Sequence, residues 1–228
     1  MVSIIIPCLN EAGVICRLLE SLQPLRCAGH EVILVDGGST DGIVEVAEPL
    51  VDLLLDTEPS RSRQMNAGAR SSVGDILWFL HADTRLPENA VEAVVEGLAE
   101  GDAVWGRFDI ELSGKHPMLR VVGSMINRRS RWSGIATGDQ GIFVTSKAFQ
   151  TVGGFPYIPL MEDIVLSRQL KQLSLPRCLQ QRLVTSSRRW EVNGIFRTIL
   201  LMWFLRLAFF LGVSPHWLAQ WYKAQVTK

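Results

Sequence analysis

Acidic side chains follow three apolar segments in the first third of the sequence. Glu11 comes after the segment 2–6, Asp36 after 31–35, and Asp83 after 76–80, where the stretch FLHADTRLP also places His81. If these segments are parallel strands, their carboxyl ends lie at one edge of a sheet and the acids converge there. Converging carboxylates repel each other unless a cation or the hydrogen-bond donors of a ligand lie between them. The pattern favours a ligand site, although HAD alone also fits a hydrogen-bonded strand end or a plain surface loop.

The elements that must position these side chains follow a repeating pattern. Over the first hundred residues, apolar segments alternate with amphipathic ones; the apolar segments are 2–6, 31–35, 51–55 and 76–80, and the amphipathic ones are 11–22, 41–48, 61–70 and 88–98. Four such repeats predict β-α units in an α/β fold, with a mostly parallel sheet and helices on both faces. Beyond them we expect strands at 102–108, 141–145 and within 177–190, and helices at 118–132, 162–173 and the C-terminus.

Composition indicates one large domain with an uneven charge distribution. The chain has 228 residues, of which 47% are hydrophobic, enough for a sizeable core. Residues 1–106 carry 6 basic and 17 acidic side chains, and residues 107–228 carry 17 and 6. The basic half either faces something anionic, such as phosphate groups, a membrane surface or nucleic acid, or is attracted to the acidic half. Four cysteines without a C-x-x-C pair predict a reduced, cytoplasmic protein with no disulfide.

The longest apolar stretch, residues 195–213, leaves three interpretations open. Arg197 and Arg206 interrupt it, and nine residues of helix place them on opposite sides. An arginine at the centre of a membrane-spanning helix is unfavourable by about 2.5 to 3.5 kcal/mol on insertion scales. The stretch is therefore interpreted as a core or oligomer helix, a membrane-surface helix or, least well supported, a spanning helix. Arg128, Arg129 and Arg131 are interpreted as a solvated helix face rather than a clamp for lipid phosphate.

Seven motifs, taken together, resemble a known family. They are SIIIPCLNEAG, EVILVDGGSTDG, RSRQMNAGA, GDILWFLHADTRLP, GDQGIFV, GGFP and MEDIVLSRQL. In this order and spacing they resemble the motifs of inverting glycosyltransferases of family 2, which have the GT-A fold, and in particular a small bacterial subgroup with poorly defined substrates. The resemblance covers about residues 2–190. It implies a GT-A domain at 1–190, followed at 191–228 by a helical segment that packs on the domain, an oligomer partner or a membrane surface.

The resemblance implies a nucleotide site at the carboxyl edge of the sheet. Asp36 would accept a hydrogen bond from the base, with Ser39 nearby, and Gly68 would allow close packing of a helix. The other residues implied to line or flank the nucleotide are Pro7, Asn10, Glu11, Arg61, Arg63 and Asn66.

HAD stands where the family has its D-x-D metal motif. In an extended segment alternate side chains point the same way, so His81 and Asp83, on either side of Ala82, would both reach a cation bound to the diphosphate. The resemblance thus implies Mn²⁺ or Mg²⁺ as cofactor, with Asp83 as a ligand. His81 replaces the first aspartate, and would either ligate the metal or bond to a phosphate or ribose.

The resemblance also implies the catalytic base. Asp163, preceded by Glu162 in MEDIVLSRQL, would take the proton from the acceptor hydroxyl; the alternative is that both acids only favour a helix start. Asp139 and Gln140 would be polar contacts near the donor sugar or acceptor. Processive relatives have Q-x-x-R-W where this chain has SSRRW, so Ser186 replaces the glutamine, while Arg189 and Trp190 are retained as acceptor or pyrophosphate contacts.

The function implied is transfer of a sugar from a nucleotide-diphosphate donor to an acceptor hydroxyl, with inversion, by a transferase of hexosyltransferase type. Its partners would be the sugar donor and a lipid-linked or small-molecule acceptor, with no nucleic acid; a membrane surface and a homo-oligomer stay open. The protein would be cytoplasmic or peripheral at the inner face of the membrane. One alternative is a non-catalytic nucleotide-binding or scaffold protein, marked by His81. A nucleotidyltransferase is the other, but it should have lysine in the loop after the first strand, and PCLNEAG has none.

Overall fold

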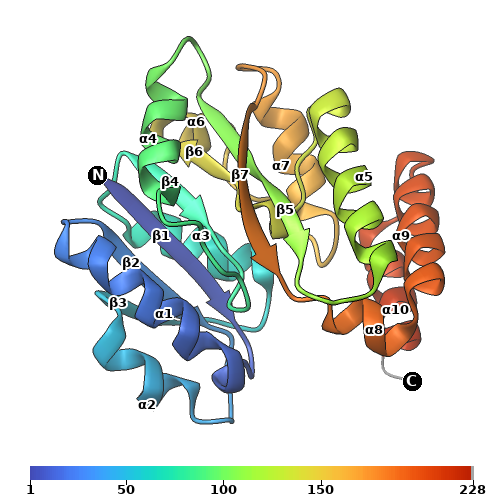
Figure 1. Cartoon of the computed structure of the whole chain (residues 1–228), viewed down its shortest axis with the longest axis horizontal. Helices are drawn as coiled ribbons and strands as arrows, with labels where there is room; N and C mark the ends of the chain where they lie inside the picture. The colour runs from blue at the N-terminus through green and yellow to red at the C-terminus, as the bar shows by residue number, and fades with distance from the viewer. Residues whose placement is uncertain (227–228) are drawn as a thin grey trace.

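A seven-stranded sheet with helices on both faces forms the body of the molecule (Figure 1), in a computed structural model that describes residues 1–226. The strand order is β3-β2-β1-β4-β6-β5-β7. Strand β6 runs antiparallel to its neighbours β4 and β5, and the other neighbouring pairs are parallel. The prediction of a mostly parallel α/β sheet is therefore confirmed. The strands are β1 (Val2–Cys8), β2 (Glu31–Asp36), β3 (Leu53–Asp56), β4 (Ile76–Phe79), β5 (Trp105–Leu112), β6 (Phe143–Thr145) and β7 (Arg177–Thr185).

Ten α-helices and two short 3-10 helices cover the sheet and one of its ends over residues 1–226. The helices are α1 (Ala12–Cys27), α2 (Ile43–Ala47), α3 (Arg61–Ser71), α4 (Ala90–Ala99), α5 (Pro117–Ser133), α6 (Ser146–Thr151), α7 (Glu162–Leu170), α8 (Arg188–Asn193), α9 (Ile195–Phe210) and α10 (Pro215–Val226); the 3-10 helices are η1 (Glu48–Leu50) and η2 (Gly138–Gln140). Among the described residues, no helix combines the length and apolar character needed to cross a bilayer.

The core lies on both faces of the sheet because the central strands are apolar throughout. Ile4 and Ile6 pack with α1, α2 and α4, whereas Ile5 packs with α3, α6 and α7 on the other face. A Cβ on Gly68 would lie 2.5 Å from Ile5 Cγ2, so glycine at this position lets α3 approach β1. Close packing of α3 brings Arg61, at its first residue, to the carboxyl edge of the sheet.

The end of β5 and the segment after β6 differ most from the sequence-based expectation. Strand β5 continues to Leu112, four residues beyond the predicted end, because it pairs in parallel with β7 as far as Thr185. A short helix, α6, follows β6 where none was predicted, with Thr145 as its N-cap: the Ala148 N–H donates to the Thr145 hydroxyl (3.3 Å). Neither difference changes the edge at which the acids converge.

Candidate functional site

Asp36 is a buried carboxylate held by its own loop. It is 2% exposed, and its Oδ2 accepts the N–H groups of Gly38 (2.9 Å) and Ser39 (2.8 Å). Its Oδ1 accepts the Ser39 hydroxyl and the Cys8 thiol. Burial raises the Asp36 pKa, but the hydrogen bonds from Ser39 and Gly38 outweigh it, so the pKa lies below its usual value. With four donors already on its two oxygens, Asp36 could accept a bond from a base only by displacing one of them.

The loops after β1 and β2 are tied together beside Asp36. The Asn10 N–H donates to the Ser39 hydroxyl (2.8 Å), and Asn10 Oδ1 accepts the Thr40 N–H (2.9 Å). Asn10 itself has a left-handed backbone (φ 54), which asparagine tolerates better than most residues. The structure thus brings Asn10, Asp36 and Ser39 together at the end of β1, where Pro7 pairs with Val35.

Glu11 and Asp83 face each other across the edge of the sheet. The Glu11 pKa is raised by burial and then by the negative charge of Asp83, while Arg188 and Arg61 act to lower it. The charges of Asp83, Arg188 and Arg61 therefore all lie near Glu11. Arg188 was not selected from the sequence, where Arg189 matched the family motif; its signal was only its place beside that arginine in SSRRW.

The HAD segment is a turn, and the prediction of an extended segment is wrong. The Thr84 N–H donates to the His81 carbonyl (3.1 Å), which closes a turn over residues 81–84 because β4 has already ended at Phe79. His81 Nε2 is buried without a hydrogen-bond partner, and a Cβ on Gly138 would lie 2.8 Å from it. Burial, followed by the charges of Arg61 and Arg189, holds the His81 pKa well below its usual value, so the imidazole is neutral.

The Asp163 carboxylate lies opposite His81 across a small cavity, lined also by Arg61, Gly138 and Glu162. Its Oδ2 accepts the Gly138 N–H (2.9 Å) and its Oδ1 accepts the Ile164 N–H (2.7 Å). Burial raises the Asp163 pKa; these two hydrogen bonds and the charge of Arg206 only partly offset the effect. The carboxylate is thus fixed in direction and more basic than a surface aspartate.

Glu162 is buried beside Asp163 at the start of α7. It is 7% exposed, and burial together with the Asp163 charge raises its pKa to about 7, against the attraction of Arg61. A buried carboxylate with such a pKa binds its proton more tightly when folded than when unfolded, so its contribution to stability falls as pH rises from the unfolded pKa toward 7.

Replacing Glu162 by glutamine should therefore stabilise the fold at pH 8 and have little effect at pH 4. The gain in free energy of unfolding at pH 8 is expected to reach up to about 3 kcal/mol, since each pKa unit corresponds to about 1.4 kcal/mol. Urea unfolding of wild type and Glu162→Gln at the two pH values measures it. The control is Glu88→Gln, at an exposed position. An equal gain in stability of Glu162→Gln at both pH values would contradict the raised pKa of Glu162.

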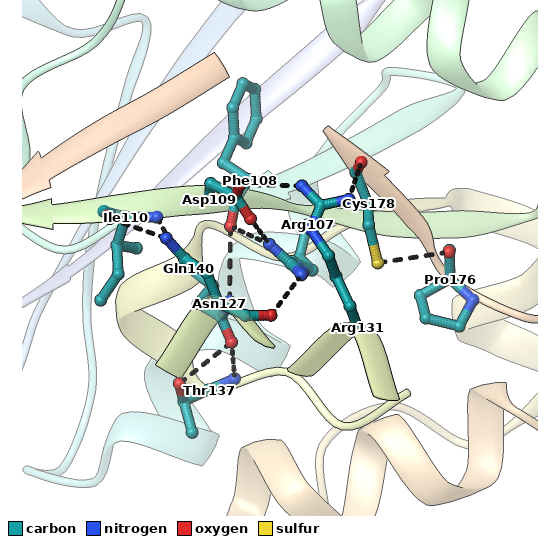
Figure 2. Close-up of polar contacts among 10 residues, drawn as sticks. All are labelled: Arg107, Phe108, Asp109, Ile110, Asn127, Arg131, Thr137, Gln140, Pro176 and Cys178. Carbon is teal, nitrogen blue, oxygen red and sulfur yellow. Dashed lines mark hydrogen bonds and ion pairs between the residues drawn. The ribbon is translucent and has the colours of Figure 1, made fainter. Parts of the chain in front are cut away.

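A network of polar contacts holds η2, the short helix that contains Gly138; Figure 2 shows the contacts of its last residue, Gln140. Gln140 is completely buried; its Oε1 accepts the Thr137 N–H (3.1 Å) and its Nε2 donates to the Phe108 carbonyl (3.5 Å). The same stretch of β5 carries a buried charge pair, because Arg107 is 0% exposed and its Nη1 bonds to Asp109. Gln140 thus supports the loop, whereas Asp139 Oδ1 is buried without a hydrogen-bond partner.

Two arginines of α5 make polar contacts near the site. The interpretation as a solvated face is wrong for Arg129, which is half-buried, and holds for Arg131, which is exposed although it pairs with Asp109. Arg131 Nη2 donates to Asp109 Oδ2 (2.7 Å), as Figure 2 shows. Arg129 Nη1 donates to the Ile135 carbonyl (3.3 Å), while its Nε and Nη2 are buried without partners. Burial and the charge of Arg206 lower the Arg129 pKa to about 10, against Asp139 and Asp163. Arg128 is exposed, as expected.

Three residues selected from the sequence make their contacts elsewhere. Arg63 pairs with Glu58 (3.0 Å) and lies over the Tyr157 ring. Asn66 is buried and exchanges two hydrogen bonds with the backbone of Phe155 (2.8 and 2.9 Å), a structural tie. Trp190 packs in an apolar cluster with residues of β5 and α5. Arg61, two residues before Arg63, and Arg188, two residues before Trp190, lie near the Glu11 carboxylate instead.

The molecule is an α/β domain with a mostly parallel sheet and a cluster of charged side chains at one edge, and sequence comparison assigns its family. The model of "Glycosyl transferase family 2" matches residues 3–150, and the chain belongs to that family. It is 32% identical over 161 residues to a PGL/p-HBAD biosynthesis glycosyltransferase of Mycobacterium bovis, an alignment that covers 67% of this chain and 58% of that protein. It is 30% identical over 117 residues to an undecaprenyl-phosphate 4-deoxy-4-formamido-L-arabinose transferase of Aeromonas hydrophila, covering 46% and 36%.

Solved structures show the same fold. A mannosyltransferase of Pyrobaculum calidifontis, crystallised with GDP-Man and Mn²⁺, superposes with a TM-score of 0.62 at 22% identity, over 80% of this chain and 56% of that one. The sheet and its flanking helices are those of the GT-A fold, as the resemblance implied.

Proposed function

We propose that this protein transfers a sugar from a nucleotide-diphosphate donor to an acceptor hydroxyl, with inversion at the anomeric carbon. The observation that carries the proposal is the Asp163 carboxylate, oriented by two backbone N–H groups at the edge where Glu11 and Asp83 converge. In the reaction, the acceptor oxygen forms a bond to the anomeric carbon as the bond to the diphosphate breaks. Asp163 takes the acceptor proton, and the leaving nucleoside diphosphate keeps the bonding electrons.

A single displacement needs one base, and positive charge must stabilise the leaving diphosphate. Arg61 and Arg188 are the basic groups whose charges act on Glu11, so the proposal gives them this role. His81, neutral and buried, fits a polar neighbour of the sugar or ribose better than a charged one.

A divalent cation fits this edge through Asp83. In residues 1–226, no group of three or more His, Cys, Asp or Glu side chains is placed to hold a metal ion by itself. Mg²⁺ and Mn²⁺ with one carboxylate, diphosphate oxygens and waters need no such group. When bound, the cation neutralises charge on the leaving diphosphate. Asp83 is the residue that would hold it, whereas His81 Nε2 is packed against Gly138 and is not available.

Calorimetric titration with UDP, GDP, CDP and dTDP, with and without Mn²⁺ or Mg²⁺, tests the proposal. We expect one nucleotide to bind best, with a cation, and Asp83→Ala to weaken that binding about tenfold or more, as loss of even an outer-sphere partner does in metal sites. Asp75→Ala, at the opposite end of β4 and exposed, is the matched control. Metal-independent binding that is indifferent to Asp83 would favour the non-catalytic alternative. The free cysteines support a reducing, cytoplasmic setting for this activity.

A further inference from the structure

Helix α9 presents a stripe of large apolar side chains to solvent. Phe196, Leu200, Trp203, Leu207 and Phe210 are each 59–73% exposed, and their spacing of four, three, four and three residues places them on one side of the helix. Trp217, in the first turn of α10, is 64% exposed as well. We call these six residues the outer face. A contiguous surface of this size and composition is unusual on a soluble monomer and marks a contact with something else.

The opposite side of α9 already has a partner within the chain. Leu205 and Ala208 are buried against Met161 and Ile164, next to the start of α7. Arg206, between them in sequence, is half-buried, and its charge acts on the pKa of Asp163, so it lies near the site. The helix is thus apolar on both sides, and the outer side is not needed for its attachment to the domain.

Charge favours an anionic surface as the occupant of the outer face. No Asp or Glu follows Glu191 in the sequence. Helix α5 packs beside α9, with Ile126 and Ile199 in one apolar cluster (Figure 1), and its own exposed side carries Arg120 and Arg128. A second copy of the chain would bring the same basic groups together, whereas anionic lipid headgroups complement them.

We propose that the outer face of α9 and α10 docks on the surface of an anionic lipid bilayer, with α9 lying in the plane of the interface. Large aromatic side chains, basic flanking groups and a helix unable to span are the features of interfacial attachment. Attachment through this side leaves undisturbed the packing of Leu205 and Ala208 on Met161 and Ile164, on either side of Asp163 in the sequence. The inference stands on the outer face and does not depend on the proposed transfer reaction.

The test is sedimentation of the full chain with vesicles of phosphatidylcholine alone or with 30% phosphatidylglycerol. We expect stronger binding to the anionic vesicles, weakened by salt. The partition coefficient should fall by about tenfold or more in Leu200→Glu, because a side chain that would be buried in the bilayer interface becomes charged. Leu175→Glu is the matched control: Leu175 is 74% exposed and Leu200 is 72% exposed, but Leu175 lies before β7, away from the outer face. It should bind as the wild type does.

Sedimentation velocity without lipid separates the other outcomes. A monomer that binds anionic vesicles and loses binding in Leu200→Glu supports the proposal. A dimer that dissociates in Leu200→Glu and does not bind vesicles would overturn it and assign the outer face to a second copy. Failure of the folded wild type to bind either vesicle, or equal loss in Leu175→Glu, would also overturn it.

Discussion

Asp163→Asn is expected to retain nucleotide binding and to lose sugar transfer, with kcat lower by a factor of about 10²–10⁴, the range contributed by a positioned general base. Asparagine has nearly the same shape, so it can still accept from one of the two N–H groups that orient Asp163, but it cannot take the acceptor proton. The measurement is the release of nucleoside diphosphate from a sugar donor with water as the acceptor. The donor is the one whose nucleotide binds best.

The pH profile separates loss of the base from loss of the fold. Since burial raises the Asp163 pKa, the wild-type rate should fall as pH is lowered and Asp163 becomes protonated. Asp163→Asn should lose this acidic limb. Asp139→Asn tests the alternative that Asp139 is the base, because Asp139 also lies near Arg129 and the site. A full rate in Asp163→Asn with a large loss in Asp139→Asn would transfer the role of base to Asp139.

Asp109→Ala is expected to destabilise the protein by about 3–5 kcal/mol, the range for removing one partner of a buried ion pair. Arg107 has no exposed surface, and Asp109 is the carboxylate that pairs with it and also with Arg131 (Figure 2). Without Asp109, a buried guanidinium charge would lose its counterion. Urea unfolding followed by circular dichroism gives the change in free energy of unfolding.

Glu111 provides the control for this prediction, two residues further along β5. It pairs with Arg182 (3.5 Å), but both side chains are at least half exposed, so Glu111→Ala should change stability by no more than about 1 kcal/mol. Equal destabilisation by the two substitutions would show that the strand itself, not the buried charge, is responsible. The Asp109 variant should also weaken the support of η2 through Phe108 and Gln140.

Sequence determined the fold because its signals are local and repeated. Short continuous apolar segments indicated the strands, and their alternation with amphipathic segments indicated the parallel sheet, which the parallel pairing of β1, β2, β3 and β4 confirms. Motif spacing was enough to identify the family. The positions of Glu11, Asp36 and Asp83 directly after apolar segments also predicted that they lie at one edge of the sheet, because parallel strands end on the same side.

Tertiary structure decided which side chains of each motif face the site. Arg63 and Arg61 are two residues apart on one helix, so their directions differ by about 200°. Only the packing of α3 on β1 selects which of them reaches the carboxyl edge of the sheet. The turn at His81 depends on where β4 ends against β6, and the burial of Arg129 depends on α9 covering α5. Sequence sets the side-chain types and their spacing. The environment of a charged side chain is set by segments far away in the chain, and that environment decides the pKa of the side chain and its role in the site.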